Sequence, residues 1–122
     1  MRRMVMALVL VALPVAAHAQ SISVGTFLDK ITALKKKGIF ALASSDVGLL
    51  KSEAGQAITA IQKDKAARKA SGRPLLYCAP ETAKKMSSDE MINGLSRIPA
   101  AQRSMNLREG FVRVLAEKYP CN

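Results

Sequence analysis

The chain has 122 residues, of which 49% are hydrophobic and only 4% aromatic, and its formal net charge is +10. This length suits one domain that can bury a core without a metal ion or many disulfides. A single histidine and two cysteines offer few ligands for metal chemistry and few groups for acid and base catalysis.

The first nineteen residues have the pattern of a secretory signal peptide. A basic start at residues 1–3 precedes an apolar run over residues 4–17 and a small-residue Ala-His-Ala cleavage site at residues 17–19. The run is shorter than the roughly 20 apolar residues of a membrane span, although an uncleaved N-terminal anchor helix is the alternative. We expect export to the periplasm, removal of residues 1–19, and a mature chain of residues 20–122 that forms a single helical domain.

Cleavage would change the chemistry that remains available to the chain. It removes Arg2 and Arg3, which leaves 17 cations against nine acids, and it removes His18, the only histidine. Zinc sites of the Cys and His kind and Ser-His-Asp or Cys-His catalysis would then lack their imidazole. The adjacent acids Asp89 and Glu90 fall at a predicted helix start, where acids complement the helix dipole. We therefore expect no catalytic residue, no metal and no cofactor, and a protein that is not an enzyme.

Cys78 and Cys121 are expected to form one disulfide. Exported chains meet conditions that favour disulfides, and two cysteines allow a single intramolecular pairing. In the chain-entropy view, closing a loop of this size contributes about 4 kcal/mol to stability. Two free buried thiols are the alternative interpretation.

The first predicted helix spans about residues 24–37. Apolar residues recur along it at helical spacing, and three lysines followed by Gly38 provide its stop signals. The apolar link at residues 39–42 is expected to pack into the core as one further turn. The stripe of this helix consists of Phe27, Ile31 and Leu34.

The second predicted helix follows a turn and N-cap at residues 44–46 and runs to about Ala70, before residues 71–74 (Ser-Gly-Arg-Pro) stop it. Residues 75–77 (Leu-Leu-Tyr) are then expected to form an extended core segment that delivers Cys78. The apolar face of the helix consists of Leu50, Ala54, Ala57, Ile58 and Ile61.

Two further helices are predicted between the cysteines. Ser87 with Glu90 reads as a capping box that opens one helix, which Pro99 ends, and Asn106 with Glu109 opens the last helix, which runs to about Tyr119. The sequence thus predicts an all-α fold, a small four-helix domain closed by one disulfide. The inward residues are Met91, Ile92, Leu95 and Ile98 in the third helix and Leu107, Phe111, Val114 and Leu115 in the fourth.

Residues 75–121 also follow a longer pattern: Leu-Tyr-Cys-x-Pro, an amphipathic helix with Ile-Pro at its end, a second amphipathic helix, and Tyr-Pro-Cys. This pattern resembles the C-terminal half of the Tai-type family of periplasmic immunity proteins, which neutralise peptidoglycan amidase effectors delivered by type VI secretion. The resemblance implies an exported, all-α, often homodimeric protein that is not an enzyme and that occludes the active site of a secreted hydrolase. The further cysteine pair that the family has in its N-terminal half is missing here. None of the family's effector-contacting residues corresponds to a matched position in this sequence. The matching positions are Cys78, Pro80, Ile98, Pro99, Phe111, Tyr119, Pro120 and Cys121.

Basic residues gather near the C-terminal ends of the first two predicted helices. Cations there complement the helix dipole and solubilise the surface, and the alternative is a basic patch that docks on an acidic protein or on an anionic envelope surface. Nucleic acid is not an expected partner, because no aromatic residues interleave with these clusters. The clusters consist of residues 35–37 and of Lys63, Lys65, Arg68, Lys69 and Arg73.

Two other classes of function fit the same sequence. A small periplasmic helical chaperone of the acid-activated kind also uses one disulfide across a helical core, but few groups here change charge between neutral and acid pH. A basic, envelope-associated structural protein would be held by its cationic faces and released by salt.

Overall fold

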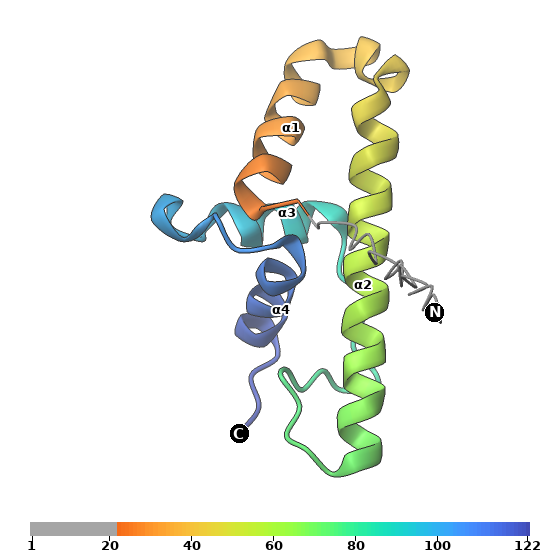
Figure 1. The fold of residues 1–122 in the computed structure, drawn as a ribbon, viewed down its shortest axis with the longest axis vertical. Helices are drawn as coiled ribbons and strands as arrows, with labels where there is room; N and C mark the ends of the chain where they lie inside the picture. Colours follow the sequence, from red (N-terminus) through yellow and green to blue (C-terminus); the bar gives the residue numbers. More distant parts are fainter. Residues whose placement is uncertain (1–21) are drawn as a thin grey trace, which may run out of the picture.

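The computed structural model describes residues 22–122, in which four α-helices and two short 3-10 helices account for most of the chain (Figure 1). The expected signal peptide, residues 1–19, lies outside the described residues. Within residues 22–122 the β-structure is limited to one isolated bridge, so the predicted all-α four-helix domain is confirmed. The elements are α1 (Val24–Lys37), η1 (Gly38–Ala43), α2 (Ser45–Ser71), α3 (Ser88–Ser96), η2 (Ala100–Gln102) and α4 (Leu107–Lys118).

Helices α1 and α2 form an antiparallel hairpin (Figure 1). The side chain of Ser23 accepts a hydrogen bond from the backbone N–H of Thr26 and caps the start of α1. Helix α2 has 27 residues, which at 1.5 Å per residue makes it about 40 Å long. It ends at Gly72, whose φ of 67° is the left-handed conformation that glycine adopts most readily.

The link at the tip of this hairpin is not packed into the core, so that prediction is wrong. It forms the 3-10 helix η1, in which no residue is buried, and Ile39, Phe40 and Leu42 are 82%, 76% and 86% exposed. Figure 1 shows the reason: the hairpin extends beyond α3 and α4, so neither of these helices covers its tip. The apolar residues of the link therefore have no core to join.

The two capping signals in the C-terminal half are confirmed. The Ser87 side chain accepts a hydrogen bond from the Glu90 N–H at 3.2 Å, and the Asn106 side chain accepts one from the Glu109 N–H at 2.8 Å. Residues 72–87 connect α2 to α3 without a helix or strand. Within this connection the Cys78 N–H donates to the Tyr119 carbonyl oxygen at 2.8 Å, which places the two cysteine segments side by side.

Helices α1 and α4 begin next to one another at a backbone junction. The N–H groups of Val24 and Gly25 donate to the carbonyl oxygens of Met105 and Arg103, at 3.0 and 2.9 Å. In return, the Leu107 N–H donates to the Ile22 carbonyl oxygen at 3.0 Å. We call these contacts the α1–α4 junction. Because Val24 and Leu107 are both fully buried there, the junction is also part of the core.

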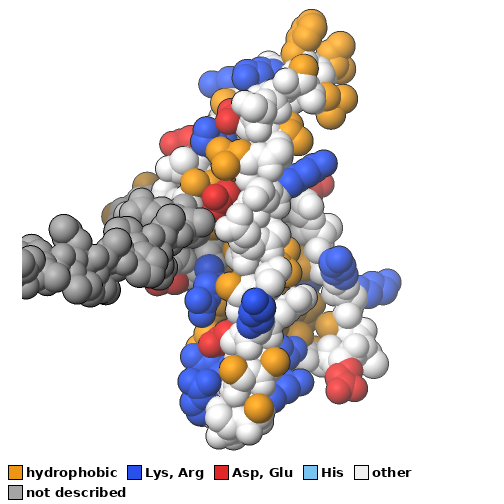
Figure 2. Space-filling view, turned by 45° about the vertical axis from the view of Figure 1, so that its right-hand side comes forward, with side chains coloured by type: hydrophobic (Ala, Val, Ile, Leu, Met, Phe, Trp, Pro, Cys, Tyr) orange, Lys and Arg blue, Asp and Glu red, His pale blue; other side chains and the backbone are white. Residues whose placement is uncertain are grey.

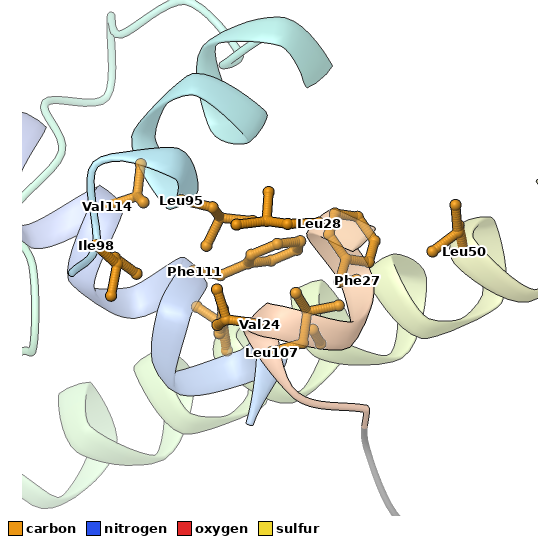
Figure 3. Close-up of a cluster of buried hydrophobic side chains, with 11 residues drawn as sticks. Val24, Phe27, Leu28, Leu50, Leu95, Ile98, Leu107, Phe111 and Val114 are labelled. Carbon is orange, nitrogen blue, oxygen red and sulfur yellow. The ribbon is translucent and has the colours of Figure 1, made fainter. Parts of the chain in front are cut away.

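The core surrounds the aromatic ring of Phe111 (Figure 3). The rings of Phe27 and Phe111 form an edge-to-face pair, with their centroids 6.2 Å apart and an interplanar angle of 85°. This is a favourable arrangement for aromatic pairs. One predicted core residue of α2, Ile58, is instead 46% exposed, because α3 does not pack closely over that part of α2. The buried residues are Val24, Phe27, Leu28, Leu50, Ala57, Ile61, Leu95, Ile98, Leu107, Phe111 and Val114.

The predicted disulfide is present between Cys78 and Cys121, whose Cα atoms lie 5.0 Å apart. It closes a segment of 43 residues that contains α3 and α4. Both cysteines are solvent-exposed, so the bond contributes through the loop it closes rather than through burial of sulfur.

Removing this crosslink is predicted to destabilise the protein strongly. Cys121→Ser frees the unfolded chain from a 43-residue loop, which costs about 4 kcal/mol of stability and lowers the Tm by roughly 15 °C or more for a domain of this size. Thermal unfolding followed by circular dichroism measures the change. The same loss should follow when wild-type protein is reduced, whereas reductant should leave the Cys78→Ser, Cys121→Ser double variant unaffected. An unchanged Tm in Cys121→Ser would contradict the assignment.

Gly110 is predicted to be required for the close approach of α4 to the junction. A Cβ atom at this position would overlap the Val24 side chain and lie 3.0 Å from Leu95 Cδ2. Gly110→Ala should therefore destabilise the fold by about 1–3 kcal/mol through overpacking. Gly55→Ala is the matched control, since nothing lies within 4 Å of a Cβ there, and it should stabilise α2 by about 0.5–1 kcal/mol. Denaturant unfolding distinguishes the two, and equal effects would contradict the packing described.

Candidate binding surfaces

An apolar groove of about 450 Å³ opens between α2 and α3. Each of these two helices packs on α1 and α4 rather than closely on the other, which leaves the space between them open. The rings of Phe27 and Phe111 belong to its lining and connect it to the core. The other apolar residues that line the groove are Ile31, Leu50, Ala54, Ile58, Met86, Met91 and Ile92.

The walls of the groove include apolar side chains that the fold leaves partly uncovered. Ile58 on α2 is 46% exposed, and Met91 and Ile92 on α3 pack against the core without being fully buried. Methionine is unbranched and polarizable, so Met86 and Met91 can adapt their shape to an incoming apolar group. The groove is therefore suited to receive apolar side chains from another molecule.

Among residues 22–122, the charged residues that line this groove are both lysines. Lys51 on α2 and Lys85 before α3 contribute ammonium groups, and the remaining polar lining residues, Gln62, Ser87 and Ser88, are neutral. An apolar segment flanked by carboxylates would find complementary charge here, and one flanked by lysines would be repelled.

The predicted basic cluster at the end of α2 is not gathered into one patch. Three of its five members bind groups of their own chain. Arg68 pairs with Asp64 at 2.7 Å, Lys65 lies 5.2 Å from the centroid of the Tyr77 ring, and Arg73 Nε donates to Ser71 Oγ at 2.8 Å.

The other two members of that cluster, Lys63 and Lys69, are exposed. Because successive residues of a helix are about 100° apart, Lys63 and Lys65 lie on opposite sides of α2. Figure 2 likewise shows Lys and Arg side chains spread along the molecule on the face that it draws. The arrangement is that of a cationic surface without a single focus.

Two ion pairs join α3 to α4 at the surface. Lys118 Nζ lies 3.0 Å from Glu90 Oε2, and Arg97 Nη2 lies 3.7 Å from Glu117 Oε1. The hydrogen bond from Lys118 holds the pKa of the Glu90 carboxyl below its ordinary value, and the same bond raises the pKa of Lys118. The stabilisation is thus present near neutral pH and lost as the pH falls through the lowered pKa of Glu90. Since both pairs are exposed, their contribution is small.

Residues 22–122 contain no group of three or more His, Cys, Asp and Glu side chains placed to hold a metal ion. None of the helices in this part of the chain is both long enough and apolar enough to span a membrane. Comparison of the chain with protein families, with curated proteins and with solved structures finds no match.

Sequence reasoning identified the cations and missed the groove. The groove is assembled from α1, α2, the segment before α3, α3 itself and α4, and each of its apolar residues taken alone reads as a core residue. All of them except Met86 were expected on the apolar faces of their helices, yet Ile58 is exposed and Met91 is only partly buried. Their exposure depends on the spacing of α2 and α3, for which the local sequence has no signal.

Proposed function

We propose that the mature chain is an exported, non-enzymatic binding protein of the immunity type, which neutralises a secreted peptidoglycan amidase by occluding its active site. The observation that supports this proposal best is the open apolar groove, whose charged lining residues in the described part of the chain are two lysines. In the proposed complex, the groove takes an apolar segment of the hydrolase that is flanked by acidic residues.

The groove by itself would act as an anchor and not as a complete interface. Fully burying a side chain such as Ile, Leu or Met is worth about 1.5–3 kcal/mol, and the walls of the groove are already half-buried. Covering Ile58, Met91 and Ile92 would therefore contribute on the order of 3 kcal/mol, whereas a nanomolar complex needs about 12 kcal/mol. The surrounding surface has to supply the remainder, over the roughly 800 Å² per partner that stable complexes bury.

The charge of the mature chain supports an acidic partner. Loss of the expected signal peptide leaves 17 cations and nine acids. A positive surface of this kind raises the rate of encounter with an acidic protein and disfavours basic ones. Lys51 and Lys85 would then set the orientation of the bound segment at the groove itself.

The resemblance of residues 75–121 to immunity proteins supports the choice of an amidase as the target. This half of the chain supplies one wall of the groove, through Met86, Met91 and Ile92, and part of its base through Phe111. The other wall comes from α1 and α2, outside the resemblance. A family-like half and a distinct N-terminal hairpin would thus share one binding surface.

We predict that the full chain, tagged after Asn122 and expressed in the envelope of its source, retains one hydrolase in stoichiometric amount and inhibits its action on peptidoglycan. Ile58→Glu should weaken inhibition at least 100-fold, because it brings an unpaired carboxylate into the apolar contact. Leu76→Glu is the matched control: Leu76 is 43% exposed, close to the 46% of Ile58, and it lies outside the groove.

The readouts are the dose dependence of peptidoglycan cleavage and the Tm of each variant. Wild type and Leu76→Glu should inhibit equally, and all three proteins should keep similar Tm values. Retention of no hydrolase, or equal inhibition by Ile58→Glu, would contradict the proposal. Retention of many unfolded proteins in place of one enzyme would contradict it too and would favour the chaperone alternative.

A further inference from the structure

The hairpin tip, which we define as residues 38–43, is the most exposed apolar surface of the described chain. Ile39, Phe40 and Leu42 are 76–86% exposed, and the other large apolar residues that are exposed range from 39% to 46%. Figure 2 shows apolar side chains clustered at the end of the hairpin, beyond the rest of the molecule. Leaving three such side chains in water is unfavourable, so a covering environment would be expected.

The region around the tip is strongly cationic. Residues 30–51, which hold the end of α1, the tip and the start of α2, contain five lysines and one acid. That acid, Asp46, is paired with Lys30 at 3.1 Å. Lys35, Lys36 and Lys37 form the last turn of α1 directly before the tip, and all three are exposed.

A second copy of the chain is a poor covering for this surface. Contact between two tips would bring two sets of three lysines together. Insertion of a tip into the groove of another copy would place the same lysines near Lys51 and Lys85, and like charges in contact are repulsive. The covering partner therefore has to combine an apolar interior with an anionic surface.

We propose that the hairpin tip inserts into the surface of a bilayer that contains anionic phospholipid. Ile39, Phe40 and Leu42 would enter the boundary between headgroups and acyl chains, while the lysines at the end of α1 contact the lipid phosphates. Because only three apolar side chains insert, the binding is reversible and depends on salt. The tip and Lys35, Lys36 and Lys37 are not among the residues that line the groove, so the proposal can be tested independently of the proposed function.

The full chain lacks tryptophan, so Phe40→Trp creates a single fluorescent reporter at the tip. We expect its emission to shift to shorter wavelength when phosphatidylglycerol is present in phosphatidylcholine vesicles, and to be quenched by brominated acyl chains in them. Pure phosphatidylcholine vesicles should produce little shift. High salt should reverse the shift that the phosphatidylglycerol vesicles cause. Since no residue of the tip is buried, the variant should keep the Tm of the wild type.

Matched variants in the Phe40→Trp background separate the local effect from overall charge. Changing Lys35, Lys36 and Lys37 to Gln should weaken partitioning into the anionic vesicles on the order of a hundred-fold, because each lysine near the surface contributes roughly 1 kcal/mol. Changing Lys63, Lys69 and Lys84 to Gln removes the same charge at exposed positions outside the hairpin tip and the last turn of α1. This change should have only a small effect on partitioning into the vesicles. Ile39→Ser with Leu42→Ser should also weaken partitioning and reduce the spectral shift.

Three results would overturn the proposal. The first is an emission spectrum of Phe40→Trp that anionic vesicles leave unchanged. The second is equal weakening by the two sets of lysine changes, which would mean that overall charge and not the tip is responsible. The third is a shift that appears without lipid as the protein concentration rises, which would mean that the tip is covered by a second copy.

Discussion

The α1–α4 junction is the contact on which the rest of the molecule depends. Three backbone hydrogen bonds connect residues 22–25 with residues 103–107, and the fully buried Val24 and Leu107 fill the space between the two helix starts. Gly110 leaves room for Val24. At about 1 kcal/mol per net hydrogen bond and 1.5–3 kcal/mol per buried side chain, this small region contributes a large part of the stability of a domain. It fixes the N-terminal hairpin to the half that the disulfide closes.

The length of α2 determines what remains uncovered. At 27 residues it is more than twice as long as α4, which has 12, so the core contacts only part of it. One end of the hairpin extends past the core with the apolar tip, and the other reaches the connection that leads to Cys78 (Figure 1). Between these ends α3 stands off from α2 and the groove opens. The tip thus lies where α2 extends past the shorter helices, and the groove lies where α3 does not pack closely on α2. The junction holds both surfaces in place.

Local signals in the sequence were sufficient to predict the helices and the disulfide. They were insufficient to predict which side chains of those helices are buried. The bounds of α1, the N-caps Ser87 and Asn106, and the disulfide all follow from residues adjacent in sequence or from a single pairing. Burial at Ile58 and in the tip was predicted wrongly, because burial depends on which helix lies opposite. Apolar residues recur at helical spacing between Leu50 and Ile61 of α2, but α3 does not pack closely enough on this part of the helix to cover Ile58. The groove was missed for the same reason, since it exists only once five segments are assembled.

Native-state hydrogen exchange would show whether the hairpin and the disulfide-closed half form one cooperative unit. We expect the amides of Val24, Gly25 and Leu107, which bond across the junction, to exchange only through global unfolding and with equal protection. Amides of residues 39–42 should exchange rapidly, because nothing buries them. Exchange of Val24 and Gly25 that is much faster than that of the α4 core residue Phe111 would contradict the account. In that case the hairpin would open on its own, and the groove between α2 and α3 would not persist as a binding site.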